Sequence, residues 1–216
     1  MMGHDLARYI DHTLLKPEAT AEQIRRLCAE AREHAFASVC INPVYVPLAA
    51  AELAGSAVAV CTVIGFPLGA ARSEVKAFEA ATAVRDGAGE LDMVLSVGAM
   101  RAGETATVRR DIEAVVAVAA GRVVKVILET CLLDAAQIAA ACRLCLAAGA
   151  GFVKTSTGFS TGGATVEHVR LMRETVGDAC GVKASGGIRS RDDALAMIDA
   201  GATRLGTSAG VAIVSG

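Results

Sequence analysis

Short apolar runs rich in β-branched residues alternate with longer amphipathic segments along the chain. Most of these runs are continuously apolar, which is typical of parallel strands that are covered on both faces. They recur about every 28 residues, the length of one strand–helix unit. The pattern predicts eight strands, at residues 9–13, 38–41, 57–64, 90–97, 123–129, 151–155, 181–185 and 204–207.

Helix start and stop signals lie between these predicted strands. Thr20 with Gln23, and Asp134 with Gln137, have the spacing of capping boxes. The apolar stripe after Asp134 contains Cys142 and Cys145, which we therefore interpret as buried helix residues and not as a metal or redox pair. The remaining signals are N-caps at Ser73, Thr165 and Ser190, and glycines just past helix ends at Gly55, Gly149 and Gly201.

Eight strands alternating with helices are compatible with a closed barrel or with an open doubly wound sheet. No glycine-rich dinucleotide fingerprint follows the first strand, and the units are evenly spaced. These features favour an α/β fold of the (β/α)8 TIM barrel type, and 216 residues suit a compact one. No linker or shift in composition interrupts the chain, so we predict one barrel catalytic domain over residues 1–216.

Composition supports a globular protein with a sizeable core. Hydrophobic residues make up 53% of the chain and charged residues 20%, which excludes a disordered chain. No apolar run approaches the ~18 residues of a membrane span, so no membrane partner is expected. The net charge of −2 and the 3% aromatic content also argue against a nucleic-acid partner.

The seven cysteines are odd in number and scattered through apolar segments. Such cysteines are typical of reduced, buried thiols. The first residues have no basic region followed by an apolar block, so we predict no secretory signal and a cytoplasmic location. The four histidines are scattered too, and we expect neither a metal nor another cofactor.

Two lysines stand out because they interrupt apolar strands. Burying a charged lysine is costly, so a single one would be interpreted as pointing outward or as paired with a carboxylate. Lys154 and Lys183, however, lie 29 residues apart, on consecutive predicted strands whose axes are about 5 Å apart. Two ammonium groups so close cannot both stay charged cheaply, so one pKa falls. The resulting free amine is a nucleophile for a Schiff base, although the pattern leaves open which lysine attacks.

Asp92 and Lys125 are two further charged residues in predicted strands. Asp92 is interpreted either as a salt-bridge partner of one of the lysines or as a carboxylate that moves protons during imine chemistry. For Lys125, a structural ion pair with Asp92 or Asp11 is the favoured interpretation.

Loops of small residues follow the later strands, at residues 157–163, 185–187 and 206–208. The loops after the last two strands of such a barrel are the usual phosphate site. Glycines let backbone N–H groups approach phosphate oxygens, and Ser or Thr hydroxyls add donors. Together these loops predict a small phosphorylated substrate.

Several sequence blocks carry a resemblance to a known family. They are IDHTLLKP, CINP, IGFPLG, ELDMVLSVG, KVILET, FVKTSTGF, VKASGGIR and GATRLGTS, and they extend from about residue 10 to residue 208. With these motifs the chain resembles deoxyribose-phosphate aldolase. The resemblance implies a class I aldolase that reversibly cleaves 2-deoxy-D-ribose 5-phosphate to D-glyceraldehyde 3-phosphate and acetaldehyde through a lysine Schiff base, without a metal.

The resemblance also implies residue roles. Lys154 would form the Schiff base, Lys183 would be the second lysine that lowers the pKa of the nucleophile, and Asp92 would transfer protons with Lys183 and a water. The expected substrate contacts are Gly186, Gly187, Gly206 and Ser208 around the phosphate, Thr157 and Gly158 along the pocket, and Asp11 and Thr13 as peripheral polar contacts.

The chain departs from the family pattern at three places. Ala209 stands where some members have a second serine, so that a hydroxyl is missing or is replaced by Thr207. Phe159 stands where some members have a basic residue. Certain members have a longer tail that ends in tyrosine and folds over the site, whereas this sequence ends at Gly216. The resemblance therefore predicts slower or more water-dependent proton transfer at the enamine.

Three alternatives and two further hypotheses remain. The alternatives are a Schiff-base aldolase of another sugar phosphate, a non-catalytic phosphosugar-binding barrel, and a metal-dependent aldolase, which the scattered histidines disfavour. Cys40 is either a buried inert thiol or, if it faces the pocket, a target for alkylation by an unsaturated aldehyde. The sequence is compatible with a homo-oligomer but does not predict its size.

Overall fold

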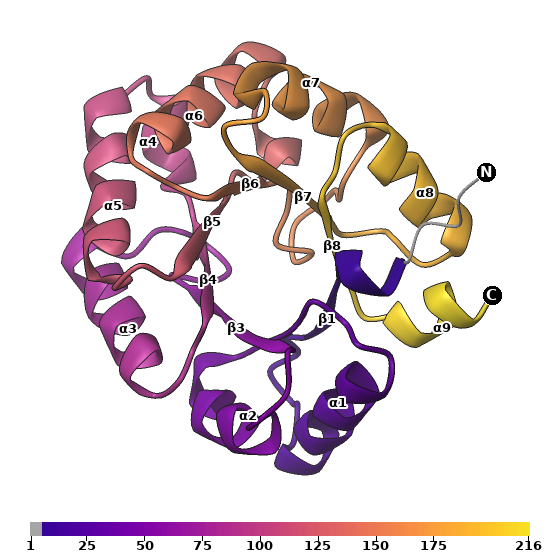
Figure 1. The fold of residues 1–216 in the computed structure, drawn as a ribbon. Coiled ribbons are helices and arrows are strands. Elements are labelled where there is room, and N and C mark those ends of the chain that lie inside the picture. Colours follow the sequence, from indigo (N-terminus) through magenta and orange to yellow (C-terminus); the bar gives the residue numbers. More distant parts are fainter. Residues whose placement is uncertain (1–5) are drawn as a thin grey trace.

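The computed structural model describes residues 6–216. Eight parallel strands pair in chain order and close into a barrel, and helices surround it on the outside (Figure 1). The predicted (β/α)8 barrel is therefore confirmed. The first five residues of the predicted 1–216 domain, including the histidine at position 4, lie outside the described residues.

The strands are short, and most of their residues are buried, because side chains on one face fill the barrel and those on the other meet helices. Their bounds are β1 Ile10–Leu14, β2 Ser38–Ile41, β3 Ala59–Ile64, β4 Glu90–Val94, β5 Val123–Ile127, β6 Phe152–Lys154, β7 Gly181–Ser185 and β8 Arg204–Thr207.

The helices cover the barrel and contribute to the main apolar core, which lies between them and the strands. None of the described helices is long and apolar enough to cross a membrane. Their bounds are α1 Ala21–Glu33, α2 Val46–Glu52, α3 Ser73–Arg85, α4 Val97–Arg101, α5 Thr105–Val118, α6 Ala135–Ala147, α7 Val166–Val176, α8 Arg191–Asp199 and α9 Gly210–Ser215, with 3-10 turns η1 Leu6–Tyr9, η2 Pro43–Tyr45 and η3 Thr130–Leu132.

Four predicted strands, at 57–64, 90–97, 123–129 and 151–155, are longer than the observed β3, β4, β5 and β6, and local turns explain two of the differences. The run 90–97 ends as β4 at Val94 because Ser96 already precedes the first turn of α4. The run 123–129 ends as β5 at Ile127 because Glu129 adopts a left-handed conformation with φ 55°. Apolar character continues past both strand ends and gives no sign of either turn.

The predicted capping signals are confirmed with one exception. Thr20 and Asp134 form the predicted capping boxes, and Thr165 and Ser190 are N-caps whose side chains accept backbone N–H groups. Ser73 was wrongly predicted as an N-cap: it is the first residue of α3. Its hydroxyl instead donates a hydrogen bond of 2.9 Å to Asp111 Oδ1 in α5.

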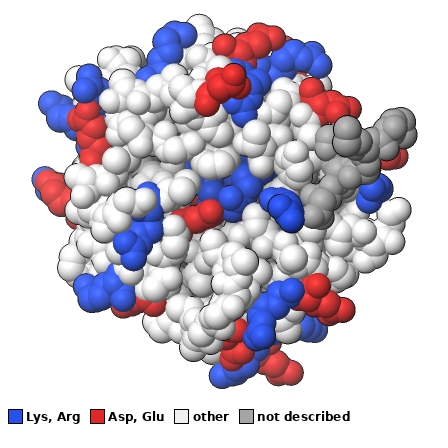
Figure 2. Space-filling model, viewed as in Figure 1, with Lys and Arg blue, Asp and Glu red and all other residues white. Residues whose placement is uncertain are grey.

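Surface charge on the face drawn in Figure 2 is mixed. Basic and acidic side chains alternate around the rim, and both signs also meet near the middle of this face (Figure 2). No large surface of one sign is visible there, as the small net charge leads one to expect.

A buried ion pair joins α3, α5 and the end of β4. Lys76 Nζ lies 2.5 Å from Asp111 Oδ2 and donates a 2.9 Å hydrogen bond to the carbonyl oxygen of Val94. Both side chains are almost fully buried. Removing one member would leave the other charge buried without its partner, which is more costly than the pair itself is favourable.

We therefore expect Lys76→Met to lower the free energy of unfolding by about 3–5 kcal/mol. Arg109→Met is the matched control, because Arg109 forms an exposed pair with Glu113, and it should change stability by less than about 1 kcal/mol. Urea unfolding followed by circular dichroism measures both. Equal losses in the two variants would contradict the structural importance of the buried pair.

Candidate active site

Lys154 and Lys183 meet inside the barrel, as their spacing predicted. They are register partners on β6 and β7, and both side chains are almost completely buried. Each Nζ atom lies 2.7 Å from the same atom, Oδ2 of Asp92 on β4. The three candidate catalytic residues therefore form one contiguous group.

Both oxygens of Asp92 are fully occupied. Oδ1 accepts from Lys125 Nζ at 2.8 Å and from Cys61 Sγ at 3.1 Å, and Oδ2 accepts from the other two lysines. Burial alone would raise the pKa of Asp92, but the three lysines outweigh it and hold this pKa well below its usual range. Asp92 is thus a carboxylate anchored by ion pairs, and Lys125 makes the predicted structural pair with it.

Asp11 lies beneath this group and not at the cleft. The sequence predicted a peripheral substrate contact, but Asp11 is fully buried, where it contacts Lys183 Nζ and accepts from Arg204 Nε at 2.7 Å. Burial lowers the pKa of Lys183, yet the carboxylates of Asp11 and Asp92 outweigh burial and raise it above the ordinary value. Lys183 is therefore held as an ammonium ion.

A cleft of about 590 Å³ opens at the carboxyl ends of β1, β6, β7 and β8. Lys154 lines this cleft, whereas Lys183 and Asp92 lie below it. The other predicted contact residues in its wall are Thr13, Thr157, Gly158, Gly186, Gly187, Gly206 and Ser208.

Close backbone packing fixes two of the cleft loops against each other. A Cβ atom on Gly163 would lie 2.3 Å from the carbonyl oxygen of Gly186. The Ala164 N–H donates to the carbonyl oxygens of Ser185 and Gly186 at 3.0 Å. Gly186 itself has φ 86°, which favours glycine. The glycines of these loops thus allow the two backbones to pack against each other, in addition to leaving backbone N–H groups accessible to a ligand.

Gly206 has a second function that the sequence did not indicate. A Cβ atom there would meet Lys183 Cε at 3.1 Å and Ser185 Cβ at 2.9 Å. The absence of a side chain makes room for the lysine.

Glu129 is a site residue that the sequence analysis did not identify. It is buried and accepts from the hydroxyl of Thr157 and, at 3.3 Å, from its N–H. The Thr157 oxygen in turn accepts from the Phe159 N–H at 3.0 Å. This arrangement orders the wall of the cleft. Because the Thr157 hydroxyl donates its proton to Glu129, that proton is not available to a ligand. The acidic residue at the fifth position of the block KVILET was the signal that could have identified it.

The structure defines the surroundings of two departures from the family pattern, at Ala209 and at Phe159. The Thr207 hydroxyl donates to the carbonyl oxygen of Ile188 at 2.7 Å and accepts from the Ala209 N–H. Its proton therefore does not replace the missing serine hydroxyl. Phe159 is half exposed and packs edge-on against Phe66, with ring centroids 5.2 Å apart.

The sequence analysis also did not identify two exposed basic residues in the cleft wall, Lys16 and Arg189, as site residues. Neither side chain forms an ion pair within residues 6–216. Both belong to sequence blocks that follow strands, LLKP and GGIR, which was the signal that could have identified them.

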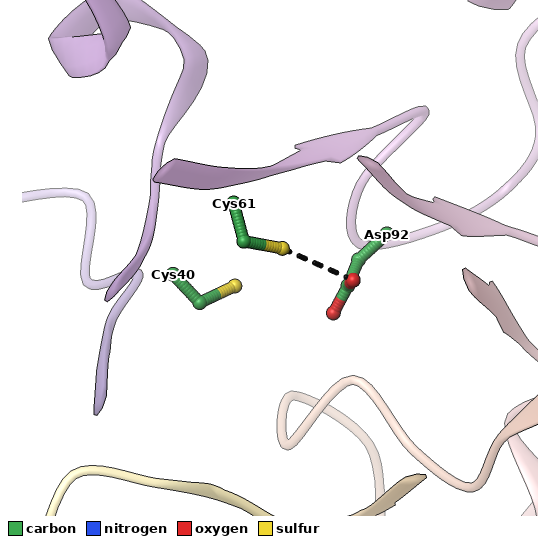
Figure 3. A group of neighbouring side chains, drawn as sticks. All are labelled: Cys40, Cys61 and Asp92. Atoms are coloured by element: carbon green, nitrogen blue, oxygen red, sulfur yellow. Dashed lines mark hydrogen bonds between the residues drawn. The ribbon is translucent and has the colours of Figure 1, made fainter. Parts of the chain in front are cut away.

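Cys40, Cys61 and Asp92 are a group of metal-ligating residue types within the described part of the chain (Figure 3). Burial, the neighbouring Cys40 and the Asp92 carboxylate raise the pKa of the Cys61 thiol, so that it stays protonated and donates to Asp92. A cation here would displace lysines that already saturate Asp92, so the group does not fit a metal. Cys40 is fully buried in this group and does not line the cleft, contrary to the condition for its alkylation.

These features define a class of protein: a (β/α)8 barrel enzyme with an amine in the wall of its cleft and a carboxylate–lysine group behind it. The model of the DeoC/LacD family of aldolases matches residues 6–216. The chain therefore belongs to this aldolase family.

Relatives agree with this assignment over nearly the full length. The chain is 62% identical to the deoxyribose-phosphate aldolase of Streptococcus gordonii, over 98% of the chain and 96% of the relative. It is 60% identical to that of Brevibacillus brevis, with 98% and 96% covered.

Among solved structures, a putative deoxyribose-phosphate aldolase from Coccidioides immitis superposes with a TM-score of 0.96, at 47% identity over 98% of this chain and 85% of the other. The tetrameric deoxyribose phosphate aldolase of Aeropyrum pernix gives 0.91, at 40% identity over 97% and 89%.

We expect Gly163→Ala to separate the two cleft loops, because the nearest obstacle to the new Cβ is backbone. The Ala164 amide should exchange its hydrogen about tenfold faster, since its bonds to Ser185 and Gly186 would be strained. Gly98→Ala is the control, with nothing within 4 Å of the new Cβ. Unchanged exchange at Ala164 would show that the loops adapt without separating.

Proposed function

We propose that this protein cleaves 2-deoxy-D-ribose 5-phosphate reversibly to D-glyceraldehyde 3-phosphate and acetaldehyde, as a class I aldolase without a metal or other cofactor. The observation that carries the proposal is Lys154 in the cleft wall, with its amine against Asp92 and Lys183. The names of the relatives supply the substrate.

In this proposal Lys154 is the nucleophile. Its amine adds to C1 of the open-chain sugar, and the carbinolamine loses water to give a protonated imine. A base removes the proton from the C3 hydroxyl, a carbonyl forms at C3, and the C2–C3 bond breaks. C3 to C5 leave as D-glyceraldehyde 3-phosphate, and the imine takes up the electron pair of the broken bond as an enamine. Protonation of C2 and hydrolysis then release acetaldehyde and regenerate the amine.

Asp92 and Lys183 are proposed to move the protons, directly or through water. Asp92 is ionised and Lys183 is an ammonium ion, so they provide an acceptor and a donor 2.7 Å apart. The charge of Lys183 also disfavours a second ammonium ion beside it, which favours the free amine at Lys154.

The phosphate is proposed to lie at the loops after β7 and β8. Backbone N–H groups of Gly186, Gly187 and Gly206 would face its oxygens, and the Ser208 hydroxyl would add a donor. Thr157, Gly158 and Thr13 would line the rest of the cleft. Lys16 and Arg189 supply positive charge nearby and form no salt bridge within residues 6–216, which supports an anionic substrate.

The proposed enzyme is a single catalytic domain that works in the cytoplasm as a homo-oligomer. Six of the seven free thiols are buried, which suits a reducing compartment. Exposed apolar side chains on and before α3, namely Leu68, Val75 and Phe78, support self-association.

Borohydride reduction in the presence of acetaldehyde tests the nucleophile. We expect an ethyl adduct on Lys154 by peptide mass spectrometry, and none in Lys154→Ala. An adduct on Lys183 instead would exchange the two lysine roles. A folded parent protein without any adduct would favour the non-catalytic phosphosugar-binding barrel.

A panel of sugar phosphates then tests the substrate. Cleavage of 2-deoxy-D-ribose 5-phosphate should far exceed that of other sugar phosphates, and activity should be indifferent to EDTA. Preferred cleavage of a different phosphosugar would keep the lysine chemistry and reject the proposed substrate.

Lys183→Leu tests the electrostatic role of the second lysine. Without its charge, the acid limb of the kcat/KM profile should move to higher pH, because the remaining carboxylates favour an ammonium ion at Lys154. Circular dichroism checks the fold of the variant. The parent's rate and pH profile in Lys183→Leu would contradict this role.

A further inference from the structure

Charged residues also close the opposite end of the barrel from the cleft. Arg204 and Glu90 are the first residues of β8 and β4. Arg204 Nη2 lies 2.8 Å from Glu90 Oε2, and its Nε lies 2.7 Å from Asp11 Oδ1. The guanidinium carbon of Arg204 lies 5.9 Å from the ring centre of Phe152. Neither Arg204 nor Glu90 lines the cleft.

Two continuous chains of contacts connect this end to Lys154. In the first, Asp11 lies between Arg204 and Lys183, and Lys183 lies 2.7 Å from Asp92 Oδ2. In the second, Lys125 Nζ lies 2.7 Å from Glu90 Oε2 and 2.8 Å from Asp92 Oδ1. Both chains end at Asp92, whose Oδ2 contacts the Lys154 amine.

The charges in these chains are balanced when Lys154 is a neutral amine. The carboxylates of Asp11, Glu90 and Asp92 match the cations Lys125, Lys183 and Arg204. The thiols of Cys40 and Cys61 also face this interior. The remaining nearby carboxylate, Glu129, accepts from Thr157 and forms no ion pair among residues 6–216. A protonated Lys154 would therefore add one unmatched positive charge to a water-poor interior.

We propose that Arg204 and Glu90 are positioning residues that set, from the closed end of the barrel, the pH at which the Lys154 amine becomes reactive. The proposal rests on the proposed function, in which Lys154 forms the imine. Neither residue touches the substrate. They act through Asp11 with Lys183, and through Lys125, on the charge that surrounds Lys154.

Removing either residue's charge has opposite consequences. Without Arg204 the interior has one carboxylate in excess, which favours an ammonium ion at Lys154, so higher pH is needed for activity. Without the Glu90 charge it has one cation in excess, which favours the free amine, so activity extends to lower pH. A purely structural role for these residues would give no such pair of opposite shifts.

The experiment compares pH profiles of kcat/KM for 2-deoxy-D-ribose 5-phosphate cleavage. Arg204→Met should move the acid limb upward by roughly one pH unit, and Glu90→Gln should move it downward by a similar amount. Arg204→Lys restores the charge and should return the limb toward the parent position. Arg109→Met removes an exposed cation of α5 and should leave the limb unmoved.

Shifts of the same sign in Arg204→Met and Glu90→Gln, or no shift in either, would overturn the proposal. If Arg204→Met fails to fold, Glu90→Gln alone decides, because Gln keeps the shape and part of the hydrogen bonding. Trapping with acetaldehyde and borohydride separates the two levels of inference. A folded parent without any adduct rejects the proposed function, and an adduct on Lys183 exchanges the two lysine roles. An adduct on Lys154 without the opposite shifts rejects only this inference.

Discussion

One buried carboxylate, Asp92, holds the centre of the barrel together by accepting from three lysines and a thiol. Burying three amines in a barrel interior is unfavourable unless their charges are matched. Asp92 contacts Lys125, Lys154 and Lys183 at once, with nitrogen–oxygen distances of 2.7–2.8 Å, and Asp11 and Glu90 add further carboxylates beside Lys125 and Lys183. The same contacts that make the interior stable place the Lys154 nitrogen, the Lys183 ammonium ion and the Asp92 carboxylate next to one another. Stability and chemistry therefore depend on one set of contacts.

The closed barrel is what allows such a set to form. Register brings Asp92 beside Lys125 on β4 and β5, and Lys154 beside Lys183 on β6 and β7. These two pairs are far apart in sequence, but closure turns all four side chains toward one axis, where their charged atoms meet. Gly206 on β8 completes the arrangement because it leaves space for the Lys183 side chain.

Period and residue type were sufficient to predict the barrel and the lysine pair. Continuous apolar strands at even spacing define the units, and two lysines one unit apart are neighbours in a barrel whose strands pair in chain order. The sequence did not predict that Asp11 lies buried below the cleft, in contact with Arg204. Its environment depends on Arg204, which is 193 positions away and meets it only when the barrel closes. The prediction of Ser73 as an N-cap was wrong for a related reason, because its hydroxyl binds Asp111 of another helix and not a backbone N–H of its own helix.

In barrels of this type the catalytic residues lie at the carboxyl ends of the strands, and residues at the amino ends usually contribute to stability. In such barrels the interior is usually filled by apolar side chains, so no charged groups connect one end with the other. Here the interior is a stack of alternating charges in which each carboxylate lies between cations from both sides. A change of charge at one end then alters the electrostatic energy of every group above it, with little screening by solvent. In the proposed linkage, the closed end of this barrel acts electrostatically on the site, although neither Arg204 nor Glu90 lines the cleft.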